Sequence, residues 1–167
     1  MALSMASTGC LGNVGGDQDK QTSAVDESTR PGEQGTSLQA TFEDAGNAFD
    51  VPWRVIASIA WAETRWQMVQ GAVEHEGMDA AHGIMALRGD RLGEAATLAN
   101  LPLETVKTDL RANVQAAAAL LSKYADELAI DRKNLGAWAE AAVKYSGIED
   151  VEAQAAYVHR EVFHALK

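Results

Sequence analysis

The feature that most constrains the fold is a long stripe of apolar side chains near the middle of the chain. Between residues 110 and 128 these side chains recur at steps of three and four, the period of an α-helix that buries one face. The stripe consists of Leu110, Val114, Ala117, Leu121, Tyr124 and Leu128. Since strand-like alternation is absent over any length, we predict an all-α fold with this helix at the centre of its core.

Shorter stretches with the same period predict helices on both sides of the central one. Thr36 and Gln39 fit a capping box for a first helix that ends near Phe49, and Asp50 is expected to cap a second helix reaching Glu63. Further helical pieces are predicted over residues 93–100, 103–107, 135–145 and 151–162. Residues 67–93 contain five glycines, and we expect them to form a long loop.

The first part of the chain has the composition of a tether. Residues 11–37 hold six Gly or Pro residues and almost no large apolar side chains, so they cannot bury enough surface to offset the entropy of ordering. We therefore predict a signal-like segment and disordered tether over residues 1–37, and one folded domain over residues 38–167.

The only cysteine lies in this tether, after a run of small residues. The segment "LSMASTGCLGN" resembles the cleavage box of bacterial lipoproteins. That resemblance implies acylation of Cys10, anchoring to a membrane, and a secreted or periplasmic location in the cell envelope. Nothing basic precedes the cysteine and only nine residues do, which leaves a free cysteine in a loose tail as the alternative.

Composition excludes several classes of partner. The chain has 14 basic and 24 acidic residues and a formal charge of −10, which argues against DNA or RNA because phosphate binding needs clustered Lys and Arg. One cysteine excludes an internal disulfide. His75 and His82 lie among acids, but their spacing is not that of a zinc site, so we predict no metal and no cofactor, and a soluble, monomeric domain.

An acid in an unexpected place points to chemistry. In "WAETRWQ", Glu63 ends an apolar helical run and falls on its apolar face. Burial against Trp61 and Trp66 would raise its pKa toward the range of a proton donor, which glycoside cleavage requires. The alternative is a surface carboxylate paired with Arg65.

Four segments appear in an order that resembles a known family. They are "IASIAWAETRW", "HGIMAL", "RANVQAAAALLSKYA" and "AVKYSG". From about Leu38 to the C-terminus the chain resembles the lysozyme-like family of soluble lytic transglycosylases and goose-type lysozymes. A closer likeness is to the lysozyme-like modules found ahead of amidase domains in bacterial wall enzymes. The resemblance implies a lysozyme-like helical domain with a long cleft loop.

The resemblance also implies roles for individual residues. Glu63 matches the acid and base that cleaves the bond between N-acetylmuramic acid and N-acetylglucosamine in peptidoglycan and closes a 1,6-anhydro ring. Tyr145 matches the tyrosine near this acid, and Asn113 matches a position that faces the core. The residues implied to contact the glycan are Trp66, His82, Gly83, Ile84, Met85 and Ser146.

Departures from the family pattern leave alternatives open. Ala86 stands where the family has Gln and Ser146 where it has Asn, which removes two amides able to bind sugar. A non-catalytic wall-binding module, of an amidase or associated with one, is therefore the second hypothesis. A second acid, Glu76 or Asp79, would instead favour hydrolysis. Because the chain and the wall polymer are both anionic, we expect binding through stacking and hydrogen bonds, with Trp66 in the cleft and Trp53 and Trp138 in the core.

Overall fold

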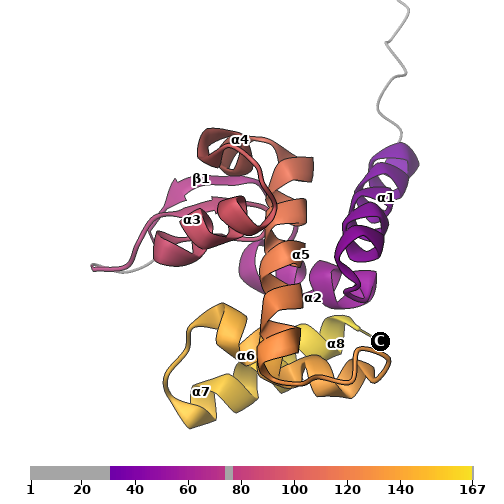
Figure 1. Ribbon diagram of the computed structural model, residues 1–167, viewed down its shortest axis with the longest axis vertical. Coiled ribbons are helices and arrows are strands. Elements are labelled where there is room, and N and C mark those ends of the chain that lie inside the picture. Colours follow the sequence, from indigo (N-terminus) through magenta and orange to yellow (C-terminus); the bar gives the residue numbers. More distant parts are fainter. Residues whose placement is uncertain (1–30, 74–76, 167) are drawn as a thin grey trace, which may run out of the picture. The chain divides into compact units, whose positions relative to one another are not determined.

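The computed structural model describes residues 31–73 and 77–166, and it is mostly helical. Helix α5 (Leu110–Glu127) runs through the middle of the fold and contacts α1, α2, α3, α4 and α6 (Figure 1). The carboxylate of Asp109 caps α5 by accepting a hydrogen bond of 2.8 Å from the amide of Ala112. The predicted central helix is thereby confirmed.

Two helices precede this centre, and their starts differ from those predicted. Helix α1 (Pro31–Phe49) begins before Thr36, so the predicted capping box lies inside the helix. Helix α2 (Trp53–Thr64) starts after Pro52, not after a cap by Asp50. Asp50 has a φ of 52° in the turn between the helices, where its carboxylate lies 3.7 Å from the guanidinium of Arg132.

The prediction of one long loop over residues 67–93 is wrong. Strands β1 (Val69–Ala72) and β2 (Ala81–Gly83) form a small antiparallel sheet in which Val69 pairs with Gly83, and α3 (Gly89–Leu98) follows. Each strand is too short to display a period of two in the sequence. Helix α4 (Leu103–Thr108) then leads into α5.

The C-terminal part packs against the lower end of α5 and against α2 (Figure 1). A 3₁₀ turn, η1 (Leu135–Trp138), leads into α6 (Ala139–Ser146), which ends at Gly147 with a left-handed φ of 70°, as predicted for a C-cap. The predicted last helix is divided into three pieces. These are α7 (Val151–Ala156), the π-helical turn η2 (Tyr157–Val162) and α8 (Phe163–Ala165).

Some predictions fall outside the described residues. Cys10 and the tether up to residue 30 are among them, as are Glu74, His75 and Glu76. By internal contacts the folded unit begins at Pro31. Within the described ranges, no helix has both the length and the apolar character needed to cross a membrane.

Candidate functional site

A tight turn after β2 forms one side of the candidate site. His82 and Leu87 exchange two backbone hydrogen bonds, of 2.9 and 3.0 Å, across residues 83–86. Gly83 has a φ of 76°, which an L side chain rarely adopts. A Cβ at this position would lie 2.0 Å from the side-chain amide of Asn113. Both conformation and space therefore require glycine here.

Asn113 on α5 anchors this turn from below. Its side chain is fully buried, and its Oδ1 accepts a hydrogen bond of 2.9 Å from the amide of Met85. Its Nδ2 donates to the carbonyl oxygens of His82 at 3.1 Å and Val106 at 2.9 Å. One amide thus holds β2, the turn and α4 to the central helix.

Two hydroxyl groups anchor the same turn from other directions. Thr64, the last residue of α2, donates a hydrogen bond of 2.7 Å to the carbonyl of Ile84. The hydroxyl of Tyr145 on α6 donates one of 2.6 Å to the carbonyl of Met85. Burial, and next the charge of Glu63, raise the pKa of Tyr145 well above its ordinary value of 10.0, so this donor stays protonated.

Glu63 lies beside this anchored turn, held by groups that are distant in sequence. The hydroxyl of Tyr157 on η2 donates a hydrogen bond of 2.7 Å to its Oε1. Nη2 of Arg88 lies 3.7 Å from its Oε2. The Glu63 side chain is 13% exposed and that of Arg88 is 9% exposed, so a reacting atom could reach the carboxylate while bulk water screens the pair only weakly.

The π-helical turn explains how Tyr157 reaches Glu63. The turn starts at Tyr157 and packs against α2. π-helical turns are uncommon in proteins, but those that occur are frequently found at functional sites. The extra residue in such a turn changes the direction of the side chains relative to a regular helix. Burial first, and then the charge of Glu63, raise the pKa of Tyr157 above its ordinary value of 10.0. Its hydroxyl therefore remains a donor to the carboxylate.

Arg88 connects the anchored turn to Glu63. It precedes the first residue of α3, and its Nε donates a hydrogen bond of 3.4 Å to the carbonyl of Ala86. Ala86 has a φ of 49°, an uncommon value for a residue other than glycine. Ala86 thus contributes a backbone carbonyl to the guanidinium that faces the acid.

The turn residues predicted to contact glycan lie near Glu63, but their side chains are not all available for contact. Ile84 and Met85 are fully buried in the core, and the carbonyl of each accepts an anchoring hydrogen bond. The Ser146 hydroxyl donates to the carbonyl of Val143 at 2.8 Å and accepts from the amide of Ile148 at 3.2 Å. Ser146 thus closes α6, and its contact with glycan stays a prediction, as do those of His82 and Gly83.

The surroundings predicted for Glu63 differ from those observed. Side chains two residues apart on an α-helix point about 200° apart, so Trp61 projects from the side of α2 opposite Glu63. Trp66 packs against Trp61, with ring centroids 5.0 Å apart. Arg65, the alternative partner of Glu63, forms an ion pair of 2.7 Å with Glu161. Trp138 is buried as predicted, and Trp53 is partly buried against the core.

Sequence reasoning missed Tyr157 and Arg88. Tyr157 follows Glu63 by 94 residues, and its neighbours Val158 and Val162 fit an uninterrupted helix, so the pattern did not reveal the π-helical turn. Arg88 stood in a region read as a loop. No feature of the sequence alone assigned it to Glu63, because their proximity depends on how the turn and α3 pack.

Two further observations bear on the chemistry of the site. Among residues 31–73 and 77–166, no group of three His, Cys, Asp or Glu side chains is arranged to hold a metal ion. Asp79, one candidate second acid, lies against Gly89 at the first residue of α3.

A scan against protein-family models and searches of curated proteins and of solved structures found no match.

Proposed function

We propose that this chain is a peptidoglycan lytic transglycosylase that cleaves the β-1,4 bond between N-acetylmuramic acid and N-acetylglucosamine. The observation that carries the proposal is the placement of Glu63. It is a largely buried but reachable carboxylate, with a hydroxyl donor on one oxygen and a guanidinium near the other. The ordered motifs of the sequence supply the substrate class.

In the first step, protonated Glu63 donates its proton to the glycosidic oxygen as the bond breaks. The carboxylate that this step leaves is stabilised by the hydrogen bond from Tyr157 and by the charge of Arg88. In the second step, this carboxylate takes the proton from the muramyl 6-hydroxyl while the oxygen closes the 1,6-anhydro ring. One carboxylate serves both steps, so the mechanism needs no second acid.

Digestion of purified sacculi, read by mass spectrometry, tests the proposal. The unaltered protein should release muropeptides with 1,6-anhydro ends, and Glu63→Gln should lower the rate by about 10²- to 10⁴-fold with the thermal midpoint nearly unchanged. Glu104→Gln, at a side chain 80% exposed on α4, is the matched control and should keep full activity. Retained activity in Glu63→Gln contradicts the assignment, and reducing ends would indicate a hydrolase.

A non-catalytic wall-binding module is the second candidate, and the environments of Ala86 and Ser146 favour it. The Ala86 side chain is buried and offers no polar group, and the Ser146 hydroxyl is engaged in closing α6. Neither replaces the amides of the family pattern. Co-sedimentation of the protein with sacculi, without release of any soluble product, would support this function over cleavage.

A further inference from the structure

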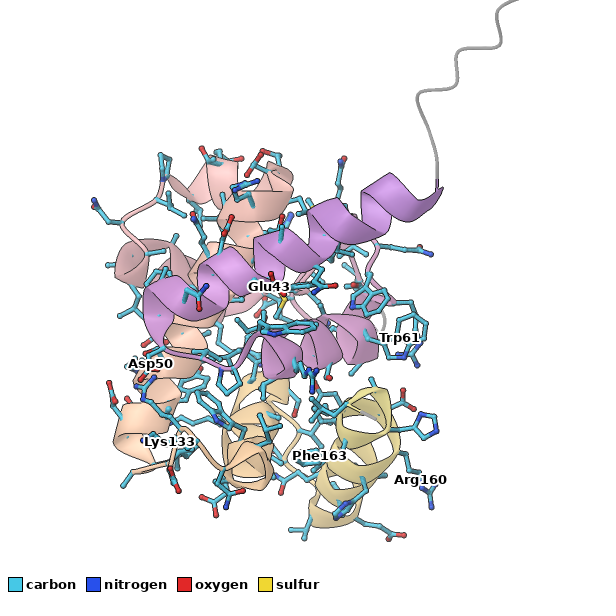
Figure 2. All side chains as sticks on the ribbon, turned by 90° about the vertical axis from the view of Figure 1, so that its right-hand side faces the viewer. Glu43, Asp50, Trp61, Lys133, Arg160 and Phe163 are labelled. Atoms are coloured by element: carbon cyan, nitrogen blue, oxygen red, sulfur yellow. The ribbon has the colours of Figure 1, made fainter. Side chains whose placement is uncertain are left out.

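An exposed pair of indole rings lies at the C-terminal end of α2, and we call Trp61 and Trp66 the indole platform. Trp61 is 37% exposed and Trp66 is 44% exposed, although large aromatic side chains are highly buried on average. Their rings meet edge to face at an interplanar angle of 66°. In Figure 2, Trp61 lies at the right-hand rim of the molecule, at the end of α2.

The platform is held rigidly, at a cost in backbone conformation. Arg65 and Trp66 have consecutive left-handed φ values of 55° and 61°, which are unfavourable for side chains of this size. Trp66 Nε1 donates a hydrogen bond of 2.8 Å to the carbonyl of Ala57, which fixes the ring against α2. Arg65 is the left-handed C-cap of α2, and the left-handed backbone at Trp66 turns the indole ring back onto that helix.

The platform is separate from the carboxylate of Glu63. Because Trp61 and Glu63 are two residues apart on α2, their side chains leave the helix about 200° apart. Trp66 bonds to Ala57 and packs on Trp61, which keeps it on the Trp61 side. A ligand stacked on the indoles would therefore lie on another side of α2 than the Glu63 side chain.

We infer that the indole platform binds one uncharged pyranose ring of a glycan strand. The apolar C–H face of a sugar stacks on indole carbon, and the Nε1 donor of Trp66 is already engaged, so the platform offers ring surface and not a donor. Arg65 lies over the Trp61 ring at 5.2 Å and pairs with Glu161, and both charged side chains are half-exposed.

The ion pair between Arg65 and Glu161 favours a sugar over an apolar protein surface as the ligand of the platform. Its two charges cancel, so the ligand meets a neutral patch in a chain with a formal charge of −10. Its exposed polar atoms can bind the hydroxyl rim of a sugar, whereas an apolar partner would have to desolvate them. The choice of a wall sugar rests on the proposed function.

Titration of the Glu63→Gln protein with N-acetylglucosamine tetramer, followed by the NMR signals of the indole N–H groups, tests this inference. The signals of Trp61 and Trp66 should shift, while buried Trp138 serves as the internal reference. Trp61→Ala and Trp66→Gly, each made in the Glu63→Gln protein, should weaken co-sedimentation with sacculi about tenfold. Trp66→Gly also relieves the left-handed strain, which protects folding.

Leu103→Ala, at an exposed apolar side chain on α4, is the matched control and should bind sacculi unchanged. In the otherwise unaltered protein, the two tryptophan variants should raise the KM for sacculi, and kcat on short soluble glycan fragments is measured beside it. Unchanged sacculus binding by both variants overturns the inference, as does a parallel loss of kcat, which would place the rings in the catalytic cleft. If the unaltered protein self-associates and the two tryptophan variants do not, while sugar binding is unchanged, the platform is a protein contact and the inference is also overturned. The binding measurements remain readable even if the unaltered protein releases no product, so the two proposals can fail separately.

Discussion

The turn at residues 83–86 and the carboxylate of Glu63 are neighbours, yet different forces hold them. The turn is anchored by neutral hydrogen bonds from Asn113, Thr64 and Tyr145, all made to its backbone groups. Glu63 is held through its charge, by a phenol and a guanidinium. The difference separates structural from chemical roles: changes at the anchors should lower stability and activity together, and changes around Glu63 should lower activity alone.

The largest loss of stability is expected for Asn113→Ala. The substitution removes the side-chain partner of the buried amide of Met85 and of the carbonyl of Val106, whereas the carbonyl of His82 keeps its backbone hydrogen bond from Leu87. Each unsatisfied buried group costs about 1–3 kcal/mol, and we expect the free energy of unfolding to fall by about 3–5 kcal/mol in urea denaturation.

Asn134→Ala is the matched control for this prediction. Asn134 caps η1 with one exposed hydrogen bond of 3.0 Å to the amide of Gly136, so its loss should cost only about 1 kcal/mol. If Asn113→Ala costs no more than this control, the buried amide does not anchor the turn.

A smaller loss is expected for Tyr145→Phe, which removes only the hydroxyl that binds the carbonyl of Met85. Leaving that carbonyl without its donor should lower the free energy of unfolding by about 1–3 kcal/mol, and activity on sacculi should fall with it. Tyr124→Phe keeps an aromatic ring beside Lys123 and Lys144 and serves as the control. If Tyr145→Phe has normal stability but no activity, the hydroxyl takes part in the chemistry and does not merely anchor the turn.

Alkaline pH should weaken the fold through the two tyrosines beside Glu63. The folded-state pKa of both Tyr145 and Tyr157 lies above the ordinary value of 10.0, so the unfolded chain loses these protons first. Their contribution is complete below pH 10 and is lost as the pH rises, by about 1 kcal/mol per tyrosine near pH 11. The thermal midpoint should therefore fall less steeply above pH 10 in the Tyr145→Phe, Tyr157→Phe double variant, and equal slopes would refute this.

The smallest change in stability is expected for Tyr157→Phe. The hydroxyl it removes binds a carboxylate that still has Arg88 nearby, so the free energy of unfolding should change by less than about 1 kcal/mol. Release of anhydro-muropeptides should nevertheless fall about tenfold to a hundredfold, because Glu63 loses the donor that orients it. A fall in stability as large as that of Asn113→Ala would remove the distinction between the two regions.

The sequence predicted the scaffold of this site better than the groups that complete it. The stripe from Leu110 to Leu128 identified the central helix, since burial of one helical face leaves a regular period. The period also placed Glu63 on the apolar side of α2. It could not indicate Tyr157, whose position depends on a π-helical turn in a segment with ordinary helical spacing.

Arg88 and the small sheet escaped prediction for related reasons. The strands are only four and three residues long, and their pairing is set by contacts with α4 and by the amide of Asn113. Arg88 reaches Glu63 only because the turn and α3 bring it there. Local patterns record which face of an element is buried, whereas these contacts depend on how the elements meet.

The close packing of Gly83 against Asn113 limits how this protein can change over evolutionary time. With asparagine at 113, any other residue at 83 would place its Cβ 2.0 Å from the amide, and with glycine at 83, replacement of the asparagine abandons three hydrogen bonds. A lineage can leave this arrangement only by altering both positions at once. Among descendants of this sequence, the two positions should therefore be inherited as a pair, 30 residues apart in the chain yet evolving as one site.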